Sequence, residues 1–545
     1  MAPLASAWRR RLRLLAPLPI ALYAVLAATT FLDYGITWDE QNLDSYGRLL
    51  VRWYATWGRD AEASHWGDHY LYGGLFELMA QGAQRVSRLG LYETRHLLNA
   101  GFGAIALLAV FGLGRALAGP LGGFLSALLL LVHPVFYGHS FNNPKDIPFA
   151  ALYCVTLFVA ARGVLRGSGP GALGAIALGA ALGAALGVRI GALVLLPCVA
   201  ALWIARALWA PPPERRRRLA RALLLLALAA LVAWIVMVSL WPYAQLDPLR
   251  NPLRALRAFQ DFHGDYVSLF EQRSVRADQL PGYYLPKWLA ITSPEVWLAL
   301  VPLGLVVSLR ALFGRRSPRR RRERALVALW LAAASALPVL WVVLTRPPLY
   351  DGMRHFLFVL PGLAVLSGVG ASHALRGLPG KAPRAAAGML LVWLASLAVR
   401  DMIELHPYQS VYFNSLVGGL PGAAGRYETD FWGSSYKEGV AWVAEHYAGP
   451  FRRPLRVANT SKCILTSYYL EKGDLPSRFV PACGDSPEPP NLVLSITRDG
   501  RHLGIPGALV HLVSRQGVPL CYVYQVRRPW LLDMDEPPPK RRPAR

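Results

Sequence analysis

Cysteine and acidic residues are scarce in this chain of 545 residues, which has 5 cysteines and 33 Asp plus Glu against 58 Lys plus Arg. The cysteines are too few and too scattered for a disulfide scaffold or a zinc site. Cys154 and Cys198 lie in apolar runs, where we expect them in the core. Cys463, Cys483 and Cys521 lie in the C-terminal region, where one disulfide can form if that region is exported.

Charge of either sign is also sparse, because charged residues make up 17% of the chain and hydrophobic residues 54%, with a mean hydropathy of +0.31. Such a composition excludes an ordinary soluble enzyme. Apolar runs of ~20 residues, the length that crosses the hydrocarbon core of a bilayer, recur along most of the chain. The sequence therefore predicts a polytopic α-helical membrane protein.

The net charge of +25 is concentrated between the apolar runs, in clusters such as Arg9–Arg13, Arg215–Arg218 and Arg319–Arg322. Clusters at alternate gaps follow the positive-inside rule, so we interpret them as topology signals and expect no nucleic-acid partner. The first apolar run is not followed by a convincing small-residue cleavage site, and we expect it to be retained as a helix.

The apolar runs predict about eleven transmembrane helices. They are expected at residues 14–32, 97–117, 119–138, 147–165, 170–188, 190–209, 219–240, 294–313, 325–344, 355–375 and 385–404. With the N-terminus inside, the arginine-rich loops are cytoplasmic and the C-terminal region is exterior. That arrangement predicts a multi-pass protein of the inner (plasma) membrane with a periplasmic C-terminal domain.

Long exterior loops are expected at residues 33–96 and 241–293. In the first, apolar side chains recur at helical spacing and predict two amphipathic helices that lie in the membrane interface. These side chains are Leu43, Tyr46, Leu50, Trp53 and Trp57 in one segment, and Leu71, Leu75, Leu78 and Met79 in the other.

The pattern changes after Glu404. Residues 1–404 are predicted to form the transmembrane domain, residues 405–530 a small exterior α/β domain, and residues 531–545 a disordered tail that lacks an apolar anchor. The stretches "RRPLRVANTSKCILTSYYLEKGD" and "NLVLSITRDG" alternate strand-like runs with turn residues, whereas Tyr436–Tyr447 has the pattern of a helix.

Two acidic motifs flank apolar runs on the predicted exterior face. Asp39 and Glu40 follow the first run in "FLDYGITWDEQ", and Asp146 precedes another in "HSFNNPKDIPFA". Asp39 would also suit a helix N-cap, and Asp146 would also suit the positive end of a helix dipole. Two carboxylates that converge on one face can instead deprotonate an acceptor hydroxyl, or hold a divalent metal ion beside a phosphate.

Cationic side chains are expected at the same level of the membrane. These are Lys145, Arg189, Arg354 and the adjacent His355. An arginine at the end of a span often only extends to the headgroups, but together these groups could clamp a phosphate. Carboxylates and phosphate-binding cations beside apolar helices suit a sugar donor carried on polyprenyl phosphate.

A separate motif, "HWGDHY", contains His65, Asp68 and His69. These residue types can ligate a metal ion, but their spacing matches no strong signature. Surface or interface roles are therefore favoured for them.

Four motifs occur in one order: "TWDEQ", "NPKDIPFA", "LPGYYLPKWLAITSPEVW" and "MRHFLFVLPGLAVL". Together they resemble the GT-C membrane glycosyltransferases, in the branch that contains protein O-mannosyltransferases and the lipid A aminoarabinose transferase. The resemblance covers residues 14–404 and implies that Asp39 is the catalytic base, with Glu40 beside it, and that Asp146 is the second acidic site. The stretch "HPYQSVYFNSLVGGLPGAAGRYETDFWGSSYKEGV" resembles a segment of uncharacterised bacterial members.

The resemblance implies an inverting transferase that moves a sugar from a polyprenyl-phosphate donor to a lipid, glycan or protein acceptor on the exterior face. Lys145, Arg189 and Arg354 are then candidates for holding the departing phosphate. Two alternatives remain: a transporter or lipid flippase, which needs ionisable groups near the bilayer midplane or broken helices, and a non-catalytic assembly subunit. No motif discloses the sugar or the acceptor.

Overall fold

The computed structural model describes residues 15–166, 169–260, 266–447, 454–472, 479–484 and 488–526. The Arg9–Arg13 cluster and the predicted disordered tail at residues 531–545 lie outside the described residues.

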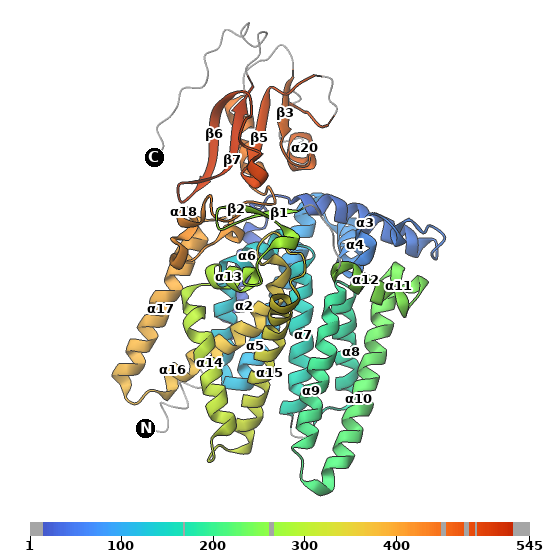
Figure 1. Cartoon of the computed structure of the whole chain (residues 1–545), viewed down its shortest axis with the longest axis vertical. Coiled ribbons are helices and arrows are strands. Elements are labelled where there is room, and N and C mark those ends of the chain that lie inside the picture. Colours follow the sequence, from blue (N-terminus) through green and yellow to red (C-terminus); the bar gives the residue numbers. More distant parts are fainter. Residues whose placement is uncertain are drawn as a thin grey trace.

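Long helices stand side by side in one bundle, and a small sheet lies beyond one end of it (Figure 1). The bundle helices are α2 (Leu18–Thr30), α5 (Leu91–Leu131), α7 (Asp146–Leu165), α8 (Ala172–Leu186), α9 (Leu195–Leu208), α10 (Pro212–Ser239), α14 (Glu295–Phe313), α15 (Arg319–Thr345), α16 (Leu360–Gly377) and α17 (Lys381–Glu404). Within the described part of the chain, eight helices are long and apolar enough to cross a membrane. The protein is a multi-pass membrane protein.

Helix α5 consists of two arms. Its backbone leaves the helical conformation at Ala118 and Gly119, where Gly119 has φ 73°, and Pro120 follows. A Cβ atom added at Gly122 would lie 2.7 Å from the carbonyl oxygen of Gly114, so the arms pack against each other on either side of the turn. The second arm is followed by α6 (Pro134–Asn142). Helices coincide with each predicted span, while the count of eleven crossings stays a prediction.

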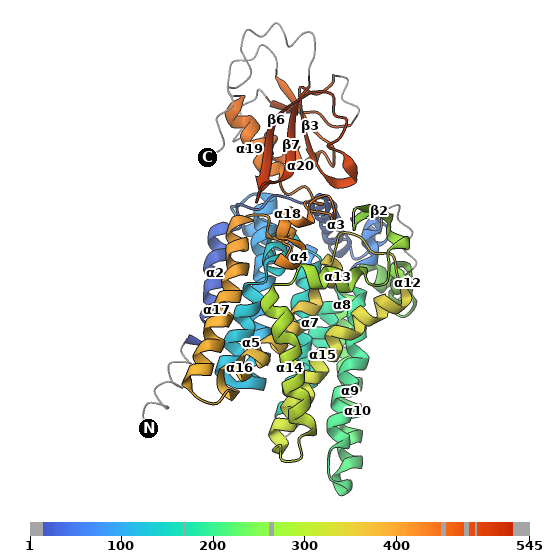
Figure 2. The same cartoon turned by 60° about the vertical axis from the view of Figure 1, so that its left-hand side comes forward.

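Shorter elements lie at the end of the bundle that faces the sheet, among them α3, α4, α12 and α13 (Figure 2). They are α3 (Trp38–Ala55), η1 (Glu62–Ser64), η2 (His69–Leu71), α4 (Leu75–Val86), η3 (Ile190–Val194), α11 (Pro242–Leu246), α12 (Arg250–Gln260), β1 (Val267–Phe270), β2 (Arg273–Arg276), η4 (Ala277–Gln279), α13 (Tyr284–Ile291) and η5 (Arg354–Val359). The helices α3 and α4 occupy the two segments predicted to be amphipathic.

Protein covers most of the apolar face of α3, although Trp57 at its end is exposed, and the place of the helix in the membrane interface stays a prediction. Tyr46, Leu50 and Trp53 are buried and pack together with Ala63 of η1. The Trp53 indole N–H also donates to Gln245 of α11 at 2.8 Å. The sequence pattern of an amphipathic helix is the same whether protein or lipid covers its apolar face, and here protein covers these residues.

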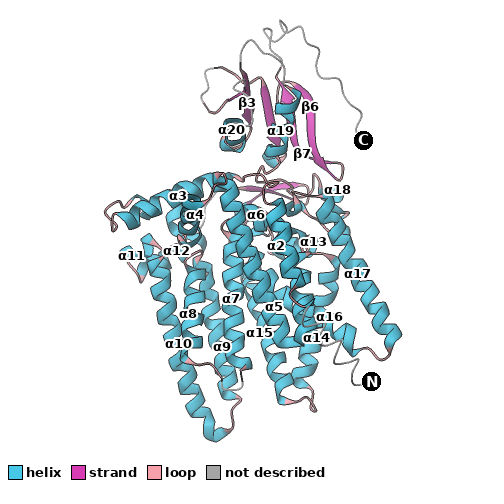
Figure 3. Ribbon diagram, turned by 180° about the vertical axis from the view of Figure 1, so that it is seen from behind, coloured by secondary structure: helices cyan, strands magenta, loops and turns pink. Residues whose placement is uncertain are grey.

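The C-terminal region carries a five-stranded sheet in the order β4-β3-β5-β7-β6. Its elements are η6 (Gln409–Val411), η7 (Ser415–Val417), α18 (Gly419–Ala423), α19 (Tyr436–His446), β3 (Leu455–Asn459), α20 (Ile464–Glu471), β4 (Phe479–Pro481), β5 (Leu492–Ile496), η8 (Arg498–Gly500), β6 (Ala508–Arg515) and β7 (Val518–Gln525). Strand β3 pairs in parallel with β4 and β5, whereas β7 pairs antiparallel with β5 and β6. Figure 3 shows α19 and α20 beside the strands.

The predicted helix that begins at Tyr436 and the strands within both quoted stretches are present. The strand-like interpretation of Ile464–Glu471 is wrong, because these residues form α20. Parallel neighbours such as β3 and β4 require a crossover connection, and the helix supplies it. Local strand propensity is overridden by this topology.

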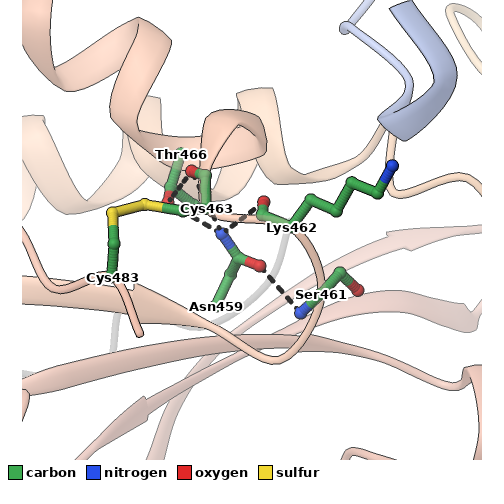
Figure 4. The surroundings of a disulfide bond; sticks show 6 residues. All are labelled: Asn459, Ser461, Lys462, Cys463, Thr466 and Cys483. Carbon is green, nitrogen blue, oxygen red and sulfur yellow. Dashed lines mark hydrogen bonds between the residues drawn. A yellow bond between two sulfur atoms is a disulfide. The ribbon is translucent and has the colours of Figure 1, made fainter. Parts of the chain in front are cut away.

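A disulfide joins Cys463, at the start of α20, to Cys483, just after β4 (Figure 4). It closes the crossover between the two parallel strands. Cys521 is buried and free, as are Cys154 and Cys198, which lie in the core as expected.

The predicted cytoplasmic loops meet at the end of the bundle away from the sheet. A cavity of 530 Å³ there is lined by Gly119 from the turn in α5, Arg320 and Arg324 from α15, and Arg376 from α16. The sides of the membrane to which the two ends belong stay a prediction.

We expect a topology reporter fused after Gly425 to be exported and one fused after Ser317 to remain cytoplasmic, because these positions lie at opposite ends of the bundle. Alkaline phosphatase activity of the two fusions in cells measures this. Activity from both fusions, or from neither, would contradict the topology.

Candidate active site

Glu40 holds the start of α3. Its Oε2 accepts from the backbone N–H of Thr37 at 2.8 Å and from the Thr37 hydroxyl at 3.2 Å, and His96 Nε2 lies 3.1 Å from Oε1. The side chain is buried, and it reaches back to the N-cap as the acidic residue of a capping box does. The capping role considered for Asp39 therefore falls to Glu40, and a part for Glu40 in the chemistry stays a prediction.

Asp39, one residue earlier, faces a different set of partners. Its Oδ2 lies 3.5 Å from an Nη of Arg354 and 3.8 Å from Nζ of Lys145. The side chain is 21% exposed, so the carboxylate remains within reach of a substrate. Two of the predicted phosphate-binding cations thus contact the predicted base.

Asp146 is the first residue of α7 and lies in the same cluster. Its Oδ2 accepts from the Asn143 amide at 2.9 Å, and its Oδ1 lies 2.6 Å from Arg189. Arg354 is 3.7 Å from Oδ2 and thereby stands between Asp146 and Asp39. Asp146 is only 2% exposed, so it does more than bias a helix dipole.

The two acidic motifs meet because their loops are hydrogen-bonded to each other. The Thr37 hydroxyl donates to the carbonyl of Asn142 at 3.2 Å, and the Asn142 amide donates to the carbonyl of Gly35 at 3.0 Å. A segment of the C-terminal region closes over this contact, since a Cβ atom at Gly35 would lie 2.1 Å from the carbonyl oxygen of Ser434. Only glycine fits at that position.

Aromatic rings line the cations, and the sequence did not single these rings out. Lys145 lies 4.9 Å and Arg189 5.7 Å from the ring centre of Tyr72. The Arg354 guanidinium lies between Tyr350, at 5.3 Å, and Trp432, at 4.8 Å. Cation–π contacts of this kind hold a cation in place and leave its positive charge available. A sequence signal for these rings was present, because aromatic residues stand beside charged ones in "LYDGMRHF" and "DFWGSS".

His355 lies at the margin of the cluster. Its ring packs edge-on against Tyr350, with the ring centres 4.9 Å apart. A contact with the donor phosphate stays a prediction for this residue.

Asp351 was missed by the sequence reasoning, although it belongs to the same motif as Arg354. Its Oδ2 accepts from the Arg354 guanidinium at 2.9 and 3.0 Å, and its Oδ1 contacts Arg498 of η8 at 2.7 Å. The carboxylate is completely buried. A third acid thus holds Arg354 from the side away from Asp39.

A divalent metal ion does not suit this cluster. Asp39, Asp146 and Asp351 each contact an arginine, and a metal ion placed among them would be repelled by Arg354 and Arg189. In the described part of the chain, no three His, Cys, Asp or Glu side chains are grouped as metal ligands would be.

The "HWGDHY" motif lies beside the cluster rather than around a metal site. The His69 ring packs against Trp66 and Tyr46. Burial and the nearby Lys145 charge lower the pKa of His69 to about 4, so the imidazole is neutral at pH 7.

The pKa of Asp39 is set by competition between burial and charge. Burial acts to raise it, but the charges of Lys145, Arg354 and Lys462 outweigh burial and lower the pKa to about 2. Asp39 is therefore ionised at neutral pH and can accept a proton. The same charges make it a weak base for as long as they remain unneutralised.

Residues 96–241 match the family model of the dolichyl-phosphate-mannose-protein mannosyltransferases. Over this stretch the chain is similar to that family. The match includes Lys145, Asp146 and Arg189 of the cluster and confirms the predicted resemblance to GT-C membrane glycosyltransferases. Membership of a bacterial subgroup stays a prediction. No curated protein matches the chain.

This chain is similar to several solved structures over most of its length. ArnT from Cupriavidus metallidurans in the apo state has a TM-score of 0.49 at 15% identity, covering 95% of this chain and 98% of that one. The same protein bound to undecaprenyl phosphate has a TM-score of 0.49 at 15% identity, with coverages of 92% and 97%. Archaeal oligosaccharyltransferase AglB from Archaeoglobus fulgidus, in complex with an inhibitory peptide and a dolichol-phosphate, has a TM-score of 0.49 at 13% identity, with coverages of 90% and 70%.

Glu40→Ala should lower the free energy of unfolding by about 1–3 kcal/mol, because it removes a helix cap and leaves buried donors without an acceptor. Thermal unfolding in detergent measures this. Glu62→Ala is a matched control, since Glu62 forms only an exposed ion pair with Arg52. If Glu40→Ala were as stable as the control yet inactive, the capping assignment would be wrong.

Proposed function

We propose that the protein transfers a sugar from a polyprenyl-phosphate donor to an acceptor at the exterior end of the bundle, with Asp39 as the general base. The observation that carries the proposal is Arg354, which lies between Asp39 and Asp146 at the mouth of an apolar helix bundle. The match to a mannosyltransferase family over residues 96–241 supports it.

The charge balance of the cluster suits a phosphate. Four carboxylates, Asp39, Asp146, Asp351 and Asp499, meet five cations. The cations are Lys145, Arg189, Arg354, Arg498 and, from the C-terminal region, Lys462. A phosphate would neutralise the excess, and the apolar helices below would accommodate its lipid chain.

The reaction is a displacement at the anomeric carbon of the sugar. The acceptor oxygen forms a bond to that carbon while the bond from the carbon to the phosphate oxygen breaks. Asp39 takes the acceptor's proton, and the lipid phosphate leaves with the bonding electron pair. Its negative charge rises as it departs, so Lys145, Arg189 and Arg354 stabilise the transition state more than the bound donor.

Donor binding also makes Asp39 a better base. The cations that lower its pKa are the cations that would contact the phosphate. A bound phosphate offsets their charge, so the pKa of Asp39 rises toward the working pH, where proton transfer is more favourable. The base is then activated only when a donor is present.

The alternatives from the sequence fit less well. A flippase would need ionisable groups near the middle of the bundle, whereas Asp146 begins α7 and Arg354 begins η5. A non-catalytic subunit would have no use for a partly exposed carboxylate held among cations. We therefore keep sugar transfer as the proposed function, with the sugar and the acceptor undefined.

Asp39→Asn should reduce turnover by ~10²–10⁴-fold, since asparagine keeps the size of the side chain but cannot take the proton. The measurement is consumption of a lipid-linked sugar by purified protein in detergent. Thermal unfolding and gel filtration establish that the variant is folded. Full activity in a folded Asp39→Asn protein would exclude Asp39 as the base.

Lys145→Met should move the acidic limb of the pH profile of kcat/KM to higher pH. Removing a positive charge beside Asp39 raises the pKa of its carboxyl from about 2, so protonation abolishes the base at a higher pH than in the native protein. Lys287→Met is the control, because Lys287 pairs with Glu271 elsewhere. If the acidic limb of the kcat/KM profile is the same in Lys145→Met as in the native protein, ionisation of Asp39 does not set that limb.

A further inference from the structure

Arg498 reaches from the C-terminal region into the buried side of the cluster. It belongs to η8, after strand β5, and its side chain is only 3% exposed. One Nη donates to Asp351 at 2.7 Å and to the carbonyl oxygen of Phe431 at 3.2 Å. A buried arginine with such definite partners is not a surface group that extends to solvent.

Each carboxylate oxygen of Asp351 contacts a different arginine. Arg498 contacts Oδ1, and Arg354 contacts Oδ2 through Nε and one Nη. The other Nη of Arg354 is the group that faces Asp39 and Asp146. Because a guanidinium is a rigid planar fork, fixing one edge of Arg354 on Asp351 fixes the direction of the remaining N–H groups.

Arg498 also holds the residue that precedes Asp39. Its guanidinium lies 4.3 Å from the ring centre of Trp38. The backbone carbonyl of the same tryptophan accepts from Lys462 at 3.2 Å. Figure 4 shows Lys462 extending away from the Cys463–Cys483 disulfide toward the N-terminal part of the chain. The C-terminal region thus contacts both the ring and the backbone of Trp38.

We propose that Arg498 is a positioning residue of the transferase, which directs Arg354 through Asp351 and Asp39 through Trp38. The inference rests on the proposed function and assigns the C-terminal region a part in completing the site. Without Arg498, the buried Oδ1 of Asp351 loses its cation. Asp351 stays paired with Arg354 but is no longer fixed at Oδ1, so the pair can rotate together and the fork no longer faces the donor phosphate.

A purely structural role would be to dock the C-terminal region on the bundle. Other contacts already do this at a distance from the cluster: Lys472 of that region lies 2.6 Å from Glu93 of α5, and the Tyr468 hydroxyl donates to the same carboxylate at 2.7 Å. Lys472→Met therefore reports the effect of weakened docking alone. Arg515→Met is a second control, because Arg515 lies in β6 and bonds to Glu438 and to the carbonyl of His406.

The test uses the full-length protein in detergent, with kinetics of lipid-linked sugar consumption and calorimetric binding of undecaprenyl phosphate. Arg498→Met should lower kcat/KM by ~10–100-fold and weaken undecaprenyl phosphate binding by ~10-fold, in the range of a lost charge-assisted contact. Lys472→Met and Arg515→Met should stay within ~2-fold of the native protein. Arg498→Lys should recover only part of the loss, because an ammonium can contact Asp351 and Phe431 but lacks the planar guanidinium that lies over the Trp38 ring.

A double-mutant cycle with Asp351→Asn separates positioning from docking. If Arg498 acts through Asp351, the losses in kcat/KM should not multiply, and the double variant should fall below Asp351→Asn alone only by the smaller part that acts through Trp38. Fully multiplying losses, native kinetics and binding in Arg498→Met, or a loss equal to that of Lys472→Met would each overturn the proposal. Full activity in Asp39→Asn would instead overturn the proposed function, while the binding measurement would still test Arg498.

Discussion

Arg354 is the group on which the arrangement of the site depends. Three carboxylates from three parts of the chain share it: Asp39 at the start of α3, Asp146 at the start of α7, and Asp351 just before η5. Each acid would be costly to bury alone, and a single guanidinium with five N–H donors can serve all of them. The ring of Trp432 holds the same cation from the side of the C-terminal region. Helix ends that are far apart in sequence are thereby fixed at one point.

In the proposed mechanism, this arrangement links donor binding to the base strength of Asp39. Lys145 and Arg354 keep Asp39 ionised but weakly basic while no phosphate is present. A donor phosphate and the Asp39 carboxylate compete for the same positive charge, so the arrival of one frees the other. Glu40 takes no part in this exchange, because its carboxylate is committed to Thr37 and His96. In the proposed mechanism, the acidic pair thus divides into Glu40, which holds the start of the helix, and Asp39, which takes the proton.

The C-terminal region also contributes residues that hold the cluster, in addition to those of the membrane-spanning helices. The turns and loops of this region supply Arg498, Lys462 and Trp432 to the cluster. The close approach of Ser434 to Gly35 keeps that region pressed against the loop that leads to α3. A rigid sheet with adaptable connections is a suitable frame for such groups, since the strands fix where each connection begins and ends.

The sequence by itself determined the helical spans, because an apolar run long enough to cross a bilayer leaves few other options. It also determined that Asp39 and Asp146 lie at the mouth of the bundle, since each directly flanks such a run. The separate roles of Asp39 and Glu40 needed the tertiary structure, because neighbouring residues on a helix point ~100° apart. Arg498 and Asp351 are 147 residues apart in sequence, and only the docking of the C-terminal region brings them together. Apolar length is a local property of the chain, whereas the partner of a buried charge is decided by the packing of distant segments.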